Sequence, residues 1–261
     1  MVVRGFRRLL LRKSLYPLHR ISFKLSLHGM GMLNYESRKL SGEQTFLKKI
    51  LNGRSVVIDV GANVGAYSSL VKRIAPDAIV YGFEPHPLAF KKLATSAQTH
   101  GFSAFNMGCS DVEAEALLYD YEEGVAHASL YRRVITEIHK KDPIEHRIKV
   151  IRLDDFLQNQ LKIEKIRLLK TDTEGNDLSV LRGAQRLIAQ NAIDVIQFEF
   201  NEMNVFARVF FRDFVDLLNR YRFYRLLPDG AVSLGKYYPV SFELFAFQNI
   251  AAVREGVDLQ L

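Results

Sequence analysis

A glycine-rich turn follows an apolar run at 55–60 and has the residue types of a nucleotide-binding loop. The run contains Asp59, and Gly61, Asn63 and Gly65 follow in the pattern DxGxNxG. Glycines at such positions let the backbone turn tightly beside a ligand, and a helical pattern comes next. Because Asp59 would repel a pyrophosphate, the turn favours a ligand with a cationic amino group and a sulfonium over a dinucleotide.

Polar residues also end the next two apolar runs. Glu84 lies 19 residues after Gly65, where a carboxylate can accept hydrogen bonds from both hydroxyls of a ribose. A helix cap before Pro85 is the alternative role. Ser110 and Asp111 follow the third run, where such folds hold an adenine amine; a simple turn pair would account for them equally well.

The stretch TDTEGND at 171–177 has the groups needed to remove a proton from a hydroxyl nucleophile. If the strand continues to residue 174, Lys170, Asp172 and Glu174 share one face and point into a cleft. Asp172 or Glu174 would then act as the base, and Lys170 would orient the acceptor oxygen. Alternatively, Glu174 only turns the chain into the next helix, and Lys170 only neutralises its acidic neighbours.

Two further candidate bases are Glu199 and His127. Glu199 lies in the apolar run VIQFEF and must be either paired or directed into the cleft, since an unpaired buried charge is too costly. His127 lies in a long irregular segment and ranks below the acids. Asp172, Glu174, Asp177 and Glu199 offer oxygen ligands for magnesium, but the sequence has no cysteine or histidine cluster, and we predict no metal ligands.

Alternating strand and helix patterns from residue 41 onward predict how these residues are positioned. The expected strands are 55–60, 78–84, 102–107, 166–172 and 192–200, and the expected helices include 67–74, 88–98 and 178–190. Runs at 115–121 and 147–153 form a β excursion, and 223–227 pairs antiparallel with 241–247. The prediction is an α/β, Rossmann-like, mostly parallel sheet with helices on both faces and an antiparallel C-terminal hairpin, as in class I methyltransferases.

Six motifs within residues 43–200 carry a family resemblance. They read DVGANVGAYS, GFEP, GCSD, LDDF, KTDTEGNDLSVLRGA and FEF, in this order. The chain resembles the FkbM-type S-adenosylmethionine-dependent methyltransferases, which methylate hydroxyl groups of sugars or other small natural products. The resemblance implies S-adenosylmethionine as cofactor, held by Asp59, Gly61, Asn63, Gly65 and Glu84. Family members often have Glu where this chain has Asp177.

The composition is that of a globular protein. The 261 residues are 48% hydrophobic and 25% charged, which excludes collagen, low-complexity disorder and a multi-span membrane protein. The one cysteine, Cys109, allows neither an intramolecular disulfide nor a thiolate zinc site and fits a reducing compartment, the cytoplasm.

The basic charge is concentrated in residues 1–40, which we expect to be an extension of a domain at 41–261. The extension has nine Lys/Arg and one acid and therefore a net charge of +8. Because the whole chain has a net charge of +7, residues 41–261 have a net charge of −1. Phe6, Leu9 and Leu10 have helical spacing among arginines, a pattern compatible with peripheral contact with an anionic membrane. A solvated helix or an organelle transit peptide would look similar.

The sequence therefore predicts an S-adenosylmethionine-dependent O-methyltransferase for a sugar, glycan or polar small molecule. The alternatives are a nucleic-acid methyltransferase that uses the basic extension as a phosphate clamp, and a non-catalytic membrane-associated binding module. Nucleic acid is disfavoured, since the domain carries −1, has no NPPY-like turn and has glycine before Cys109. An NAD-dependent oxidoreductase ranks last because the pyrophosphate pattern is absent. Neither the identity of the acceptor nor the oligomeric state follows from the sequence.

Overall fold

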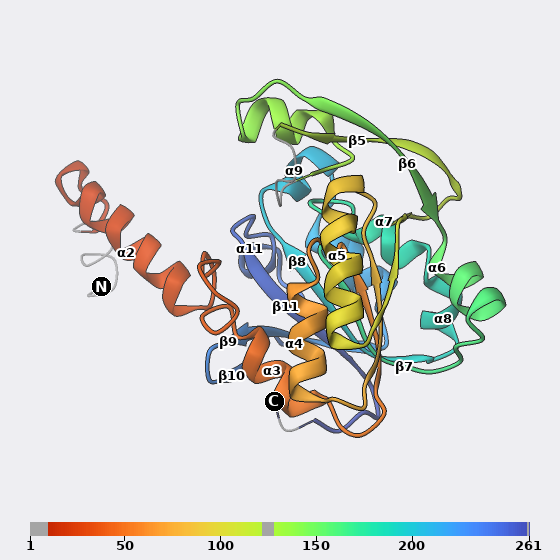
Figure 1. Ribbon diagram of the computed structural model, residues 1–261. Helices are drawn as coiled ribbons and strands as arrows, with labels where there is room; N and C mark the ends of the chain where they lie inside the picture. Colours follow the sequence, from red (N-terminus) through yellow and green to blue (C-terminus); the bar gives the residue numbers. More distant parts are fainter. Residues whose placement is uncertain (1–9, 122–127, 260) are drawn as a thin grey trace.

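The computed structural model describes residues 10–121, 128–259 and 261, and within them an eight-stranded sheet forms the centre of the molecule (Figure 1). The strand order is β10-β9-β11-β8-β7-β1-β2-β3. Strands β3, β2, β1, β7 and β8 are parallel, whereas β11 is antiparallel to both β8 and β9. The bounds are β1 Val56–Val60, β2 Ile79–Phe83, β3 Ser103–Phe105, β7 Ile166–Thr171, β8 Ile193–Phe200, β9 Tyr221–Leu227, β10 Gly230–Ser233 and β11 Gln248–Arg254. The predicted sheet and its antiparallel end are confirmed.

Alternate residues of the central strands serve two separate cores. Val57 packs with the helices of one face, and its neighbour Ile58 packs with those of the other. The first face is covered by α3 Glu43–Ile50 and α4 Ala66–Ile74, with α5 Pro87–His100 beside α4. The second is covered by α6 Leu153–Asp155, η3 Phe156–Gln160, α7 Asp177–Arg182, α8 Gln185–Ala189 and α10 Phe211–Leu217. Both faces are buried, so the strands need continuous apolar runs, as the sequence indicated.

The β excursion forms a second sheet beside the carboxyl ends of the central strands. It contains β4 Gly108–Cys109, β5 Ala114–Asp120 and β6 Ile144–Ile151 in the order β4-β6-β5. An isolated bridge joins Tyr119 to Ser129, and the π-helical turn η2 Val134–Ile138 follows. His127 lies outside the described residues.

Two sequence expectations were wrong in detail. The helix expected at 178–190 is divided into α7 and α8 at Gly183, where a Cβ would lie 2.0 Å from the Ser110 carbonyl oxygen. The last strand is β11 rather than 241–247, because α11 Pro239–Phe242 takes part of that segment. Its neighbour Glu243 instead accepts hydrogen bonds from backbone N–H groups at the start of α10.

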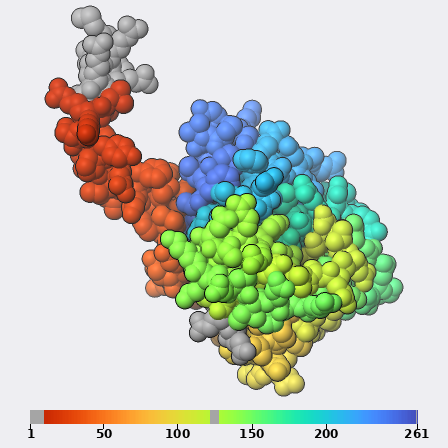
Figure 2. All heavy atoms as spheres, turned by 90° about the horizontal axis from the view of Figure 1, so that it is seen from above, coloured from red at the N-terminus to blue at the C-terminus, as the bar shows by residue number. Residues whose placement is uncertain are grey.

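The N-terminal segment extends from the body of the protein as the helix α2 Tyr16–Gly29, after the short turn η1 Lys13–Leu15 (Figures 1 and 2). Most of the helix expected around Phe6 to Leu10 lies outside the described residues. Beyond α2 the chain joins the body: Met32 is buried, and Leu33 donates its N–H to the Phe247 carbonyl. No helix in the described part of the chain is both long enough and apolar enough to cross a bilayer.

Candidate functional site

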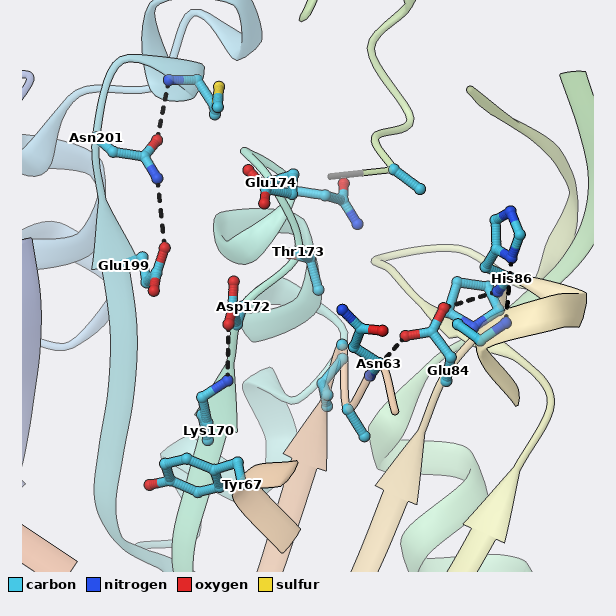
Figure 3. A pocket seen from close by; sticks show the side chains of 18 of the residues that line it. Asn63, Tyr67, Glu84, His86, Lys170, Asp172, Thr173, Glu174, Glu199 and Asn201 are labelled. Carbon is cyan, nitrogen blue, oxygen red and sulfur yellow. Dashed lines mark hydrogen bonds and ion pairs between the residues drawn. The ribbon is translucent and has the colours of Figure 1, made fainter. Parts of the chain in front are cut away.

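A cavity of about 740 Å³ lies at the carboxyl ends of the central strands. Its walls come from the turn after β1, the end of β2, the loop after β7 and the end of β8, with β5 and β6 on one side and residues 33–41 on the other. This edge of an open α/β sheet is where ligands bind, and the volume suits a small molecule. Figure 3 shows side chains that line the cavity, among them Glu84, Lys170 and Glu199.

The glycine turn approaches the loop after β7 so closely that no side chain fits between them. Gly61 has φ +77°, and a Cβ there would lie 1.8 Å from the Asp172 carbonyl oxygen. The N–H groups of Gly61 and Ala62 both donate to the Phe83 carbonyl, which ties the turn to β2. Asn63, with φ +48°, follows on the cavity wall. The turn is therefore held by backbone contacts before any ligand binds.

Glu84 is held in place by the backbone on both sides. Its Oε2 accepts a hydrogen bond from the Asn63 N–H, and its Oε1 accepts one from the His86 N–H. Each donor–acceptor distance is 2.8 Å. Burial raises the pKa of Glu84 to about 7, although these two hydrogen bonds lower it. Each oxygen keeps a lone pair on the cavity wall, as recognition of a ribose diol requires. The structure therefore places Glu84 and Asn63 together, as the sequence predicted.

Asp59 does not reach the cavity wall, in contrast to the prediction that it faces the ligand. It is fully buried behind the turn, where its Oδ2 accepts the Ser68 hydroxyl at 2.6 Å. Its Oδ1 lies 3.8 Å from the Lys170 ammonium. Asp59 thus contacts α4 and Lys170, and a contact of Asp59 with the cofactor stays a prediction.

Three other predicted cofactor residues lie off the described cavity lining. Gly65 caps α4 with φ +85° and packs against Leu93. The Ser110 hydroxyl bonds to the Asp111 carboxylate, and Asp111 faces a separate hollow beside Arg152. Their neighbours Gly108 and Cys109 do line the cavity. An adenine contact by Ser110 and Asp111 stays a prediction.

Lys170 lies at the opposite end of the cavity, surrounded by carboxylates. Its ammonium is 2.9 Å from the Asp172 carboxylate and stands 4.8 Å from the centre of the Tyr67 ring. Burial alone would lower the pKa of Lys170, but Asp172, Asp59 and Glu43 raise it above its ordinary value. Lys170 therefore remains a cation and serves as a fixed positive charge.

Lys170, Asp172 and Glu174 all line the cavity, but not as one strand face. Strand β7 ends at Thr171, and Glu174 has φ +51°, which the left-handed region allows for few side chains. The Glu174 carbonyl accepts the Ser129 hydroxyl at 2.9 Å and so joins this loop to the segment after β5.

Glu199 lies on the cavity wall, as expected, near Asn201 (Figure 3). Burial and the nearby carboxylates of Asp172 and Glu174 raise the pKa of Glu199 well above its ordinary value. This environment therefore favours the protonated form of the Glu199 carboxyl group. Carboxyl side chains predominate in the lining, which has seven of them against two Lys/Arg.

Sequence reasoning missed a buried network behind this end of the cavity. The Tyr67 hydroxyl donates to Gln197 at 2.6 Å, and Gln197 donates to Glu43 at 2.9 Å. Burial raises the pKa of Glu43. Arg38, Glu43 and Asn201 also line the cavity. Their partners are far away in the sequence, as Glu43 and Gln197 show, so no local sequence pattern marked them.

His86, Asp120 and His146 also come together, although they are far apart in the sequence. Asp120 Oδ2 lies 2.7 Å from His86 Nε2 and 3.2 Å from His146 Nε2, and among the described residues this trio alone is close enough to share an ion. However, His86 Nδ1 accepts the N–H groups at the start of α5, which leaves the proton on Nε2. A metal at Nε2 would require that proton to move to Nδ1, but two backbone N–H groups already donate to Nδ1. The trio is therefore a hydrogen-bonded link between β5, β6 and α5.

The mostly parallel sheet with its antiparallel end and the glycine turn after β1 define the class I, Rossmann-like methyltransferase fold. Residues 59–226 match the family model of the Methyltransferase FkbM domain. The chain therefore belongs to the FkbM methyltransferase family, and its cofactor is S-adenosylmethionine.

Curated relatives match about half of the chain. Methyltransferase 1 of Beauveria bassiana is 29% identical over 49% of this chain and 58% of its own length. Methyltransferase sdnD of Sordaria araneosa is 26% identical over 49% of this chain and 59% of its own length. The chain thus spans less than three fifths of these relatives.

Solved structures with a related fold have low sequence identity. A TehB-like SAM-dependent methyltransferase from Corynebacterium glutamicum is 10% identical, with a TM-score of 0.45 over 92% of this chain and 100% of that one. M. capricolum TrmK, solved with S-adenosyl-homocysteine, is 10% identical with a TM-score of 0.43. The match covers 85% of this chain and 72% of that one.

Proposed function

We propose that this protein methylates a hydroxyl group of a sugar, glycan or other polar small molecule, using S-adenosylmethionine in the cytoplasm. One observation carries the proposal. A single cavity joins the backbone-held carboxylate Glu84 at one end to the pair of Lys170 and Asp172 at the other. The first suits a ribose, and the second suits a hydroxyl that must lose its proton.

The residues present fit the cofactor. Glu84 would accept the ribose hydroxyls, and the apolar side chains of Leu130, Ile148 and Val150 line the cavity as an adenine requires. The excess of carboxyl groups favours a cationic ligand over an anionic one. When bound, S-adenosylmethionine supplies an electrophilic methyl group on its sulfonium.

Asp172 is the proposed base among the candidate carboxylates. Its oxygen is paired with Lys170, so the proton of an acceptor hydroxyl can pass to it while the ammonium balances the charge. Glu199, whose pKa is raised well above its ordinary value, would carry a proton and donate a hydrogen bond that orients the acceptor. Glu174 lies beside both and would contact another acceptor group.

The acidic lining also argues against the nucleic-acid alternative, because a phosphate backbone would meet carboxylates at the cavity. A binding module without catalysis would not need Asp172 and Lys170 on the cavity wall.

An acceptor panel tests the proposal. The full chain is incubated with S-adenosylmethionine and with neutral sugars, phosphorylated sugars or RNA, and mass spectrometry follows a gain of one methylene. We expect methylation of neutral hydroxyl acceptors. Glu199→Ala, which removes the hydrogen-bond donor, should raise the acceptor KM, and the exposed control Glu255→Ala should leave it unchanged. Methylation of RNA alone would refute the proposal, and cofactor binding without any methylated product would favour the binding module.

A further inference from the structure

Helix α2 exposes large apolar side chains to solvent. Leu18, Ile21, Phe23 and Leu25 are each 57 to 66% exposed, and Leu27 is the one buried residue of the helix. Figures 1 and 2 show the helix standing away from the body of the protein. Leu18, Ile21 and Leu25 lie on one side of the helix and Phe23 on another, and an exposed apolar patch such as that of the first three marks an interaction site.

The exposed residues of α2 are arranged in stripes. Leu18, Ile21 and Leu25 have the spacing i, i+3, i+7 and share one face, and Arg20 and Lys24, at i and i+4, form the neighbouring stripe. Both cations are exposed, and neither forms an ion pair within the described part of the chain. The sequence contains no acid before Glu36, so the surface is apolar and cationic.

We propose that α2 docks on the surface of an anionic lipid membrane. Leu18, Ile21 and Leu25 would enter the boundary between headgroups and acyl chains, and Arg20 and Lys24 would face lipid phosphates. RNA offers negative charge but no apolar phase for three aliphatic side chains. A second copy of the chain would bring the same cations to the contact, and its residues 41–261 carry only −1 in total.

Docking of α2 would also place the cavity near the membrane. The chain runs from the end of α2 directly into the cavity wall, to which Leu33, Tyr35 and Arg38 contribute. An acceptor at the membrane surface would therefore lie close to the cavity; this consequence alone rests on the proposed function.

Vesicle binding by the full chain tests the docking itself. Flotation is measured with phosphatidylcholine vesicles and with vesicles that also contain phosphatidylglycerol. Arg20→Gln with Lys24→Gln should weaken binding about 30-fold, at the usual contribution of each cation near an anionic surface. Ile21→Ser with Leu25→Ser should weaken it about 100-fold or more.

Matched controls are the exposed pairs Lys91→Gln with Lys92→Gln and Val232→Ser with Val240→Ser, which should bind as the unchanged protein does. S-adenosylhomocysteine affinity, unchanged in every variant, reports that the fold is intact. Absence of vesicle binding, or equal binding by all variants, would overturn the proposal. So would a dimer in light scattering that the Ile21/Leu25 pair abolishes, or RNA binding that the Arg20/Lys24 pair alone abolishes.

Discussion

The two ends of the cavity are built in different ways. At the end that we propose holds the cofactor (the cofactor end), backbone N–H groups hold Glu84. The glycine turn there fits against the Asp172 carbonyl oxygen with no room for a side chain. At the end proposed for the acceptor (the acceptor end), ionisable side chains from β7, β8 and residues 33–43 line the cavity. Burial raises the pKa values of Glu43 and Glu199 there, whereas neighbouring carboxylates raise that of Lys170. Backbone contacts therefore organise the first end, and side-chain charges dominate the second.

Under the proposed function, the two ends have separate roles. Changes at the cofactor end should alter binding of S-adenosylhomocysteine, and changes at the acceptor end should alter turnover. Each prediction below would break or sharpen that separation.

The largest effect is expected from Gly61→Ala. A methyl group there would lie 1.8 Å from the Asp172 carbonyl oxygen, so the turn must move and S-adenosylhomocysteine binding should be lost in calorimetry. Gly101→Ala is the matched control, because φ is also positive there, at +73°, but an added Cβ would meet no neighbouring atom within 4 Å. The control should cost about 1 kcal/mol in urea denaturation and keep full affinity. Equal binding by both variants would show that the close approach at Gly61 is not needed.

Asp172→Asn should come next, with an effect on turnover. Loss of the base should lower kcat by about 10² to 10⁴-fold in a stopped methyl-transfer assay, because the amide cannot take the hydroxyl proton. S-adenosylhomocysteine affinity should change little. A large loss of affinity with unchanged kcat would reverse the assignment of the two ends.

Glu84→Ala should weaken S-adenosylhomocysteine binding by about 100-fold, the loss expected for two hydrogen bonds to a charged acceptor. Calorimetry gives the affinity, and kcat at saturating cofactor should remain close to that of the unchanged protein. Glu84→Gln keeps the shape and should lose less. An Ala variant with undiminished affinity would remove the ribose assignment.

The smallest effect is the pH dependence of that affinity. Burial raises the pKa of Glu84 to about 7. Under the proposed function, the ribose hydroxyls bind its deprotonated form, which accepts hydrogen bonds through both oxygens. Affinity should therefore rise with pH and fall about tenfold from pH 8 to pH 6. Glu84→Gln should flatten this dependence, and a profile that stays unchanged in the variant would point to another group, such as Asp177, whose pKa burial also raises to about 7.

The sequence revealed the cofactor end better than the acceptor end. The turn from Asp59 to Gly65 and the carboxylate Glu84 are close together in the chain, and their backbone requirements appear as glycines and as strand ends. The acceptor end joins residues from distant segments, such as Glu43 and Gln197, through side-chain contacts that leave no periodic pattern. Asp59 shows that sequence reasoning is incomplete even at the cofactor end. The sequence identified the carboxylate, but where its side chain points depends on its contacts with Ser68 and Lys170.

The most direct test of the account is a crystal structure of the protein with S-adenosylhomocysteine. We expect both ribose hydroxyls within hydrogen-bonding distance of the Glu84 carboxylate, and the sulfur directed toward Asp172. A ribose bound away from Glu84, or a sulfur directed away from the pair of Asp172 and Lys170, would contradict the assignment of the two ends.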